Sequence, residues 1–388
     1  MKIKKIIGVD ATFTPHGGSL GHLQEFLNEI SLNHNENKII LYLKKENLKI
    51  IDKQILNKCT LKIINFISYG NFFRLIFSQF ILPILVLTHR IDVLFCPGNF
   101  SPIVKTTKIK CQWIATVGPF CEDMYKNISY YSKAILLINK WIILFSGYTS
   151  NIVIHQAEYS KNLFEKEFNF NSKKQYLISC GKDNYFKPIY KTSVHSKSEI
   201  LKISETDLLC VSHLYPYKNI ELLILVFSEY KKKYSNNQKL FIVGKKMSKQ
   251  YFLSLNKLVV DKNLKKYVFF TGLCSKEQLR FAYTKCKLFI FTSLCESSGY
   301  TLIEAMSCGA SILAAKNTAI PFTCQNAAEY YESHNYKDLY TKLENLLNND
   351  DKIIQMKKKS LKRASEMITY KEAVSIFLNI IDNELIKI

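Results

Sequence analysis

The sequence predicts an α/β fold of two domains, each a doubly wound parallel sheet with helices on its faces. Short apolar runs of strand length alternate with segments of helical periodicity in both halves of the chain. The length of 388 residues suffices for two domains of ordinary size. Between the two halves, residues 187–199 are polar and poor in apolar side chains, as expected of a linker.

The first half begins with an apolar strand at 3–9 and contains two helices of high apolar content. The segment 72–87 is interrupted by polar residues and Pro83, so we expect a buried or interfacial helix broken near Pro83 and not a membrane span. The segment 130–147 is predicted to be a helix with an apolar face. The other strands expected in this half are 38–43, 61–67, 92–96, 111–117 and 150–154.

The second half repeats the alternation of strands and helices. Ser275 with Gln278 three residues later is a capping-box pattern and predicts the start of a helix, and Asn219 is placed to cap another. We expect a loop at 317–328 and helices over 336–388. The strands expected here are 207–212, 239–244, 267–272, 288–292 and 311–315.

The chain is strongly basic, with a formal net charge of +22. A basic surface attracts nucleic acid, anionic membranes or acidic substrates. Only four of the 54 basic residues are arginine, the residue that reads base edges best, so we expect no nucleic-acid partner. Lys126, Lys133 and Lys140 recur every seven residues beside aromatic side chains, which is typical of a helix at a membrane interface. An ordinary helix with a solvated lysine edge is the alternative.

Eleven cysteines occur without a Cys-x-x-Cys pair, and most lie in apolar runs. This usage is typical of small buried side chains in a reducing compartment and predicts a cytoplasmic protein. The sequence has no zinc-ligand spacing and no Asp-x-Asp motif, and we expect neither a metal nor another cofactor. The N-terminal apolar run is too short for a signal peptide.

The stretch with the most chemical content is 288–315, which has the pattern strand, glycine turn, helix, strand. Glu296 lies in the turn and Glu304 in the helix, with seven residues between them. The N–H groups of a helix that follows a glycine turn favour a phosphate, and carboxylates accept hydrogen bonds from hydroxyls. Phosphate and hydroxyls together indicate a nucleotide sugar. The alternative is an ordinary βαβ unit with solvated glutamates.

Two other turns carry groups suited to a phosphate. Lys218 lies in a strand-to-helix turn, where its ammonium group is placed to meet a phosphate as a point charge. Gly17 and Gly18 precede a helix, and paired glycines let backbone amides approach a phosphate closely. A solvated lysine and a plain loop are the ordinary alternatives.

The segment from Glu296 to Gly309, Glu-Ser-Ser-Gly-Tyr-Thr-Leu-Ile-Glu-Ala-Met-Ser-Cys-Gly, resembles the E-x7-E signature of retaining glycosyltransferases of family 4. The resemblance runs most clearly over 205–330 and more faintly over 1–186. It implies a GT-B fold, in which two Rossmann-like domains face a central cleft. The implied domains are an acceptor-binding domain at 1–187, a nucleotide-sugar-binding domain at 188–370 and a helix at 371–388 that returns to the first domain.

The resemblance also implies a role for each candidate site residue. Glu296 and Lys218 would be catalytic, Glu296 contacting the transferred sugar and Lys218 the donor diphosphate. Glu304 would bind the ribose hydroxyls. The other residues implied to bind the nucleotide sugar are Gly17, Gly18, His213, Gly299, Tyr300 and Thr301.

Two positions depart from the family pattern. His213 stands where arginine is usual, which leaves either a charge that requires a protonated imidazole or a neutral hydrogen-bond donor. Val117 and Gly118 stand where the family commonly has a polar residue, often histidine, near sugar and acceptor.

The function implied is transfer of a hexose from a nucleotide diphosphate sugar to a hydroxyl of a saccharide or lipid-linked saccharide acceptor, with retention at the anomeric carbon and without a metal. The expected setting is synthesis of O-antigen, capsule or lipopolysaccharide in the cytoplasm. There the protein would be peripheral at the inner face of the cytoplasmic membrane, with an anionic membrane surface as partner. A non-catalytic membrane-surface binding protein on a GT-B-like fold is the alternative.

Overall fold

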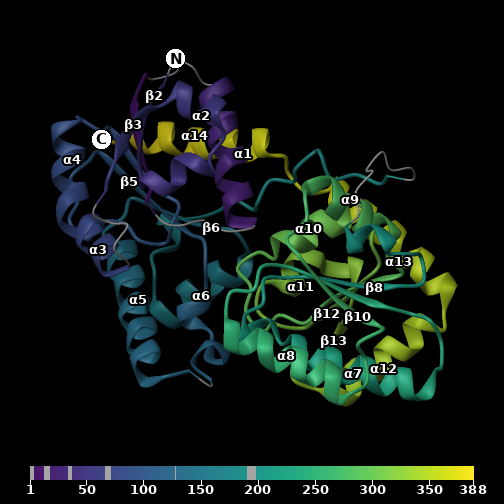
Figure 1. Ribbon diagram of the computed structural model, residues 1–388. Helices are drawn as coiled ribbons and strands as arrows, with labels where there is room; N and C mark the ends of the chain where they lie inside the picture. The colour runs from purple at the N-terminus through teal and green to yellow at the C-terminus, as the bar shows by residue number, and fades with distance from the viewer. Residues whose placement is uncertain (1–3, 13–17, 34–36, 66–70, 127, 190–197) are drawn as a thin grey trace. The chain divides into compact units, whose positions relative to one another are not determined.

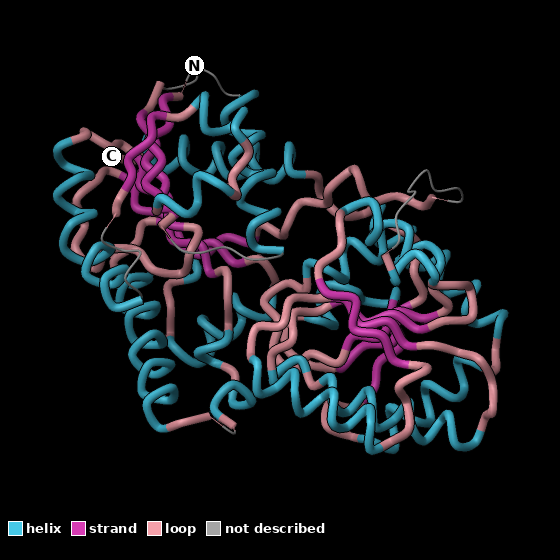
Figure 2. The backbone as a smooth tube through the Cα atoms, viewed as in Figure 1, coloured by secondary structure: helices cyan, strands magenta, loops and turns pink. Residues whose placement is uncertain are grey.

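The chain separates into two compact units, Met1–Gly181 with Ile368–Ile388, and Lys182–Met367 (Figure 1). Each unit contains one sheet with helices around it, seen as separate groups of magenta strands in Figure 2. The computed structural model describes residues 4–12, 18–33, 37–65, 71–126, 128–189 and 198–388.

The sheet of the first unit has seven parallel strands in the order β3-β2-β1-β4-β5-β6-β7. Its central strands are buried along almost their whole length, as is usual for a parallel sheet covered on both faces. The strands are β1 (Ile6–Ala11), β2 (Lys38–Leu43), β3 (Thr60–Ile63), β4 (Val93–Cys96), β5 (Ile109–Ile114), β6 (Ile152–His155) and β7 (Gln175–Leu177).

The helices of this unit include the two apolar segments singled out in the sequence. One forms α3 and α4, joined by a π-helical turn at Phe77–Ile81, and the other forms α5. The helices are α1 (Gly18–Asn33), α2 (Lys53–Lys58), α3 (Asn71–Ile76), α4 (Leu82–Thr88), α5 (Tyr130–Tyr148), α6 (Glu158–Phe168) and α14 (Tyr370–Ile386).

The π-helical turn explains how the chain passes Pro83. Proline has no N–H to donate and its ring crowds the carbonyl of the preceding helical turn. The wider turn lies just before it, and the N–H of Leu82 donates to the carbonyl of Phe77. The interruption expected near Pro83 is therefore a widened turn and not the end of the helix.

The C-terminal helix α14 completes the core of the first unit. The ring centroid of Phe377 lies 4.8 Å from that of Phe95 and 5.1 Å from that of Phe26. Phe26 in turn lies 5.3 Å from Trp113, edge to face. The last helix of the chain thus packs on the sheet of the first unit.

The sheet of the second unit has six parallel strands in the order β10-β9-β8-β11-β12-β13. Its strands are β8 (Leu208–Val211), β9 (Leu240–Val243), β10 (Val268–Gly272), β11 (Leu288–Phe291), β12 (Ile312–Ala315) and β13 (Ala328–Tyr331). Its helices are α7 (Ile220–Lys233), α8 (Lys249–Asp261), α9 (Lys276–Lys285), α10 (Tyr300–Ser307), α11 (Ile320–Cys324), α12 (Tyr336–Leu347) and α13 (Asp350–Ser365).

Two details of this unit differ from the sequence prediction. The stretch expected to be a loop after β12 contains the short helix α11, and the edge strand β13 follows it. Asn219 precedes α7 but makes no side-chain cap. Its backbone is left-handed, with φ of 52°, and the N–H of Ile220 donates to the hydroxyl of Tyr251 instead. Asparagine tolerates this conformation better than most residues.

The strand order of this unit reverses direction between β8 and β11. Strand β8 pairs with β9 on one side and with β11 on the other, so the connections after β8 and β11 leave in opposite directions. In open α/β sheets ligands bind at the carboxyl ends of the strands beside such a switch. The turn that carries Lys218 follows β8, and the turn that carries Glu296 follows β11.

Candidate functional site

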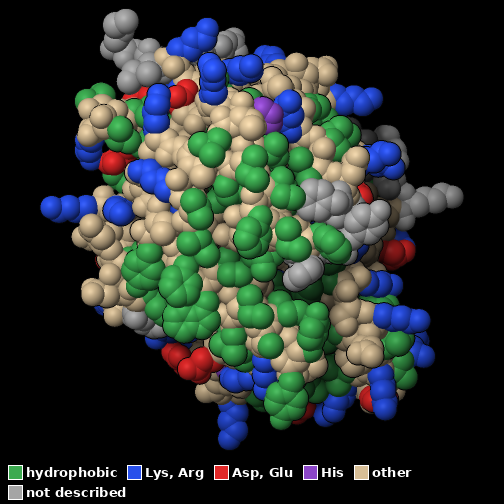
Figure 3. All heavy atoms as spheres, turned by 90° about the vertical axis from the view of Figure 1, so that its left-hand side faces the viewer, with side chains coloured by type: hydrophobic (Ala, Val, Ile, Leu, Met, Phe, Trp, Pro, Cys, Tyr) green, Lys and Arg blue, Asp and Glu red, His purple; other side chains and the backbone are tan. Residues whose placement is uncertain are grey.

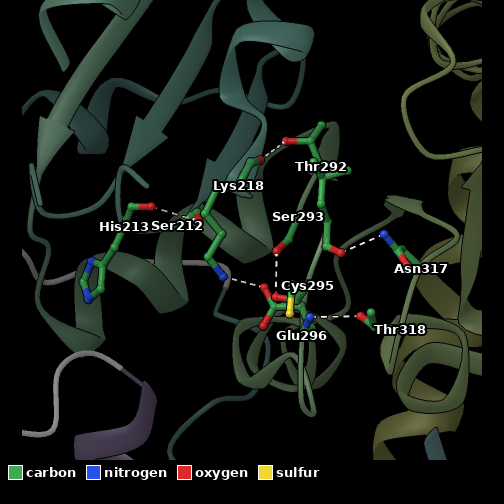
Figure 4. Close-up of polar contacts among 10 residues, drawn as sticks. Ser212, His213, Lys218, Thr292, Ser293, Cys295, Glu296, Asn317 and Thr318 are labelled. Carbon is green, nitrogen blue, oxygen red and sulfur yellow. Dashed lines mark hydrogen bonds and ion pairs between the residues drawn. The ribbon is translucent and has the colours of Figure 1, made fainter. Parts of the chain in front are cut away.

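Lys218 and Glu296 meet at the carboxyl ends of β8 and β11 (Figure 4). The Lys218 Nζ lies 2.5 Å from the Glu296 Oε1, and each side chain is 14% exposed. Lys218 Nζ also lies 4.8 Å from the ring centroid of Tyr217 and 5.8 Å from that of Phe291. Two turns that are 78 residues apart in the chain thus bring a cation and a carboxylate into one partly exposed contact.

The environment keeps Lys218 charged. Burial by itself lowers the pKa of an ammonium group, but the neighbouring Glu296 carboxylate and Tyr217 act against it. The net effect raises the pKa of Lys218 above its ordinary value. Lys218 is therefore a cation at neutral pH and a suitable partner for a phosphate group.

Hydrogen bonds from neighbouring segments hold the turn that carries Glu296. The backbone N–H of Glu296 donates to the Thr318 Oγ1 at 2.9 Å, and the Asn317 Nδ2 donates to the Leu294 carbonyl at 2.7 Å. The Thr292 hydroxyl donates to the Lys218 carbonyl at 2.8 Å, which ties the two turns together. The positions of both charged side chains are thus set by the backbone around them.

Gly299 makes the transition from this turn into α10. Its φ is +67°, and a Cβ atom there would lie 2.6 Å from the Leu302 Cδ1. Only glycine adopts this conformation without strain, so the residue fixes where α10 begins. Tyr300 and Thr301 form the first turn of the helix, whose N-terminal dipole favours an anion.

Glu304, in the middle of α10, contacts the Tyr283 side chain and not the Lys218–Glu296 pair. The Tyr283 hydroxyl donates to the Glu304 Oε2 at 3.1 Å. Burial raises the pKa of Glu304 to about 8, and the hydrogen bond from Tyr283 opposes this rise only in part. The Glu304 carboxyl is thus largely protonated at neutral pH and ionises just above it.

His213 adopts a defined orientation in the turn after β8. Its Nδ1 accepts a hydrogen bond from the Lys245 backbone N–H at 3.1 Å, so in the neutral ring the Nε2 carries the proton. Gly244 permits this close approach of the two turns. With φ of +155°, it occupies a position where a Cβ would lie 2.0 Å from the Ser212 carbonyl oxygen. In this tautomer the Nε2–H of His213 is a hydrogen-bond donor.

The other predicted site residues lie in the first unit. Gly17 falls outside the described residues, and Gly18 is the first residue of α1. Val117 is fully buried, and Gly118 opens a short 3-10 turn after β5. The structure therefore brings together Lys218 and Glu296, with α10 directly following in the chain, and describes no contact of the glycine pair.

Sequence reasoning missed Thr318, Asn317 and Tyr283. Thr318 has φ of +44°, a strained value for a β-branched residue, and such strain often accompanies a functional turn. The adjacent polar residues at the carboxyl end of β12 were a usable signal. Tyr283 lies on α9, and nothing in its local sequence indicates that it reaches Glu304.

In the part of the chain that the structure describes, no group of three His, Cys, Asp or Glu side chains lies together as metal ligands would. Within the same residues, no helix combines the length and apolar character needed to cross a membrane.

Residues 194–363 match the family model described as glycosyl transferases group 1. The serotype-specific mannosyltransferase WbdA of Escherichia coli is 25% identical over 173 residues, which are 45% of this chain. The match spans 21% of WbdA, so the matched part of this chain corresponds to about a fifth of that relative.

Solved structures resemble the chain over nearly its whole length. WaaG, a glycosyltransferase involved in lipopolysaccharide biosynthesis, superposes with a TM-score of 0.75 at 13% identity, covering 96% of this chain and 99% of WaaG. The Anabaena protein HepE, in complex with UDP and glucose, gives a TM-score of 0.68 at 14% identity, covering 98% of this chain and 100% of HepE.

These likenesses show the fold, which is GT-B, with one parallel α/β sheet in each unit. The family model covers most of the second unit, including both charged turns and α10. Residues 194–363 are thus similar to the glycosyl transferases group 1 family.

Proposed function

We propose that the protein transfers a sugar from a nucleotide diphosphate sugar to a hydroxyl of a saccharide or lipid-linked saccharide, with retention at the anomeric carbon. The observation that carries the proposal is the contact between Lys218 and Glu296 at the carboxyl ends of β8 and β11. One group binds phosphate and the other accepts hydrogen bonds from sugar hydroxyls. A sugar attached to a diphosphate presents both partners in one molecule.

In this proposal the diphosphate competes with Glu296 for the Lys218 ammonium group. When the donor binds, Lys218 contacts the phosphate oxygens and the freed Glu296 carboxylate accepts from hydroxyls of the transferred sugar. As the glycosidic bond breaks, charge develops on the leaving diphosphate, and a fixed cation stabilises it there. The His213 Nε2–H and the start of α10 at Tyr300 and Thr301 would add donors.

Retention follows in the proposal if the acceptor attacks from the face that the diphosphate leaves. The acceptor hydroxyl forms the new bond to the anomeric carbon, the bond to the diphosphate oxygen breaks, and that oxygen takes the hydroxyl proton. No metal is needed, because Lys218 and the backbone dipoles supply the positive potential. Glu304 would hold the ribose of the nucleotide.

The relatives guide the choice of substrates to test. HepE was solved with UDP and glucose, WaaG is named for lipopolysaccharide biosynthesis and WbdA is named a mannosyltransferase. For this chain we propose an acceptor in surface polysaccharide synthesis, whether O-antigen, capsule or lipopolysaccharide. We also propose that the protein acts in the cytoplasm, at the inner face of the membrane.

A non-catalytic binding protein is the second candidate, favoured by the exposed apolar side chains of α5. Thermal unfolding in the presence of a panel of nucleoside diphosphates separates the two. A glycosyltransferase is stabilised by at least one of them, since a ligand that binds only the folded state raises the midpoint. If none of the nucleoside diphosphates raises the midpoint of unfolding, the non-catalytic binding protein is favoured and the proposed catalysis is wrong.

A further inference from the structure

The outer face of α5 is apolar although it is exposed. Large side chains along it are between 47% and 91% exposed, where a helix of a soluble domain normally presents polar groups. The opposite face, with Ile143 and Leu144, is fully buried against the sheet. The side chains in this range are Tyr130, Tyr131, Leu137, Ile138, Trp141, Phe145 and Tyr148, and Ile135 is 36% exposed.

Neighbouring segments extend this face. Phe80, Ile84 and Leu87 of the π-helical turn and α4 are 60% to 69% exposed, and Val104, in the loop after β4, is 60% exposed.

Hydrogen bonds connect the loop at 101–104 to the π-helical turn and to the end of α5. The Ile103 N–H donates to Gln79 Oε1 at 2.9 Å, and Lys110 Nζ contacts both the Pro102 carbonyl and the Thr149 hydroxyl at 2.5 Å. Figure 3 shows hydrophobic side chains gathered on this side of the molecule.

The charged side chains that these segments contribute are basic. Residues 71–88, 99–108 and 129–149 contain no aspartate or glutamate, and their lysines are Lys105, Lys108, Lys133 and Lys140. The Nζ of Lys108 lies 2.8 Å from the Asp92 Oδ1, and Arg74 points inward, where it donates to the Gly98 carbonyl at 3.1 Å. Lys133 and Lys140 lie along the side of α5, where the Nζ of Lys140 is 5.2 Å from the ring centroid of Phe168. Such lysines bury their methylene stems against apolar surface and present the ammonium group at its border.

We propose that this outer face, formed by α5, α4 with its π-helical turn and the loop at 101–104, docks the protein on an anionic phospholipid bilayer. The helix α5 lies in the plane of the interface, with its tyrosines and Trp141 at headgroup level and Leu137, Ile138 and Phe145 among the acyl chains. The lysines meet the lipid phosphates. A second copy of the chain fits less well, because self-association would bring the same cations together without carboxylates from these segments.

The inference deepens the proposed lipid-linked acceptor and rests on it for its purpose, but binding to lipid is measured without any turnover. Protein binding to vesicles of phosphatidylcholine is compared with binding to vesicles that also contain phosphatidylglycerol. Trp141 is the natural probe, since the sequence has two tryptophans and Trp113 is buried in the core. We expect a blue shift of its fluorescence with the anionic vesicles, absent in Trp141→Phe.

A pair of matched variants tests the surface itself. Ile138→Gln should weaken binding to anionic vesicles by about tenfold, because it removes one buried aliphatic side chain from the interface. Leu253→Gln changes a side chain of similar exposure, 55% against 52%, on α8 in the other unit and should have no effect. Lys133→Glu with Lys140→Glu should abolish the preference for anionic lipid, whereas Lys262→Glu with Lys265→Glu should keep it.

Three results would overturn the proposal: no binding of the wild type to anionic vesicles, equal losses in Ile138→Gln and Leu253→Gln, or a wild-type dimer that Ile138→Gln converts to a monomer. Vesicle binding with no nucleotide binding would leave the docking surface standing and remove only the proposed catalysis.

Discussion

At the scale of single residues, the contact between Lys218 and Glu296 links the sequence to chemistry most directly. Each residue is ordinary by itself in a chain with 54 basic and 32 acidic residues. What distinguishes the pair is that both side chains are only 14% exposed and meet where two strand ends adjoin. A partly buried charge is stabilised by a neighbouring opposite charge. While no nucleotide sugar is bound, Lys218 and Glu296 stabilise each other in this way.

Replacing Lys218 by alanine should lower kcat/KM by about 100-fold or more, because a positioned charge-stabilising donor is worth roughly that factor. The loss should appear mainly in kcat. Lys262→Ala, an exposed lysine of the same unit, serves as the matched control. A kcat/KM of Lys218→Ala close to the wild-type value would show that Lys218 does not stabilise the diphosphate.

The affinity for the nucleotide part of the donor should rise as the pH rises through about 8, the value to which burial raises the pKa of Glu304. Ionised Glu304 accepts hydrogen bonds at both oxygens, whereas the protonated carboxyl has lost acceptor capacity. Titration calorimetry with an intact nucleotide sugar measures the profile. Glu304→Gln should flatten it and weaken binding above that pH, and an unchanged profile in this variant would exclude the ribose role.

Some residues of the site can be predicted from the sequence and others cannot. Lys218, Glu296 and Glu304 belong to a local pattern that places each at a strand end or on a helix. Thr318 and Tyr283 act through contacts that are 22 and 21 residues away in the chain, and those depend on how strands and helices pack. The tautomer of the neutral His213 ring follows from the position of the Lys245 N–H, which the local sequence does not show.

At the scale of elements, the turn between β11 and α10 is held by backbone geometry and by the segment after β12. Periodicity predicted most strands, because buried parallel strands are nearly continuous apolar runs. It missed β13, an edge strand that is mostly half-exposed and lacks such a run. It also could not distinguish a widened turn at Phe77–Ile81 from a break, since both accommodate Pro83.

Substituting Gly299 by alanine should destabilise the second unit and weaken donor binding together. The added Cβ meets Leu302 at 2.6 Å in a left-handed conformation, so we expect a loss of about 2 kcal/mol in the free energy of unfolding. Gly272→Ala has a similar φ of +75° but meets nothing within 4 Å and isolates the cost of the backbone alone. Equal losses in the two variants would show that packing at α10 contributes nothing.

The variant Thr318→Val removes the acceptor of the Glu296 N–H and keeps the shape of the side chain. A net hydrogen bond is worth about 1 kcal/mol, so a fall in kcat/KM of about fivefold is expected. Circular dichroism should show an unchanged fold. If kcat/KM stays at the wild-type value, the hydrogen bond at 2.9 Å does not position Glu296 for the reaction.

At the scale of the whole molecule, the chain forms two units, and its last helix belongs to the same unit as its first strand. Two sheets of alternating strands and helices were predictable from pattern, and the order of the strands needed the structure. The return of α14 was suggested by the resemblance, and no local pattern requires it. It depends on the side chains that α14 buries against the first sheet, such as Phe377.

Truncating this contact should destabilise the first unit. We expect Phe377→Ala to cost about 3–5 kcal/mol, since the side chain is fully buried among aromatic rings. Ile386→Ala, on the same helix but 73% exposed, should cost little. Denaturant unfolding followed by the fluorescence of Trp113 in a Trp141→Phe background reports on this core. Equal midpoints for the two variants would contradict the packing described for α14.

The most direct test of the central claim is to incubate the wild-type protein with a panel of nucleotide diphosphate sugars and follow each donor by proton NMR. We expect that at least one α-linked donor is consumed, releasing its nucleoside diphosphate and forming a product that keeps the α configuration, even where water is the acceptor. Consumption of no donor, or release of the inverted anomer as the first product, would contradict it.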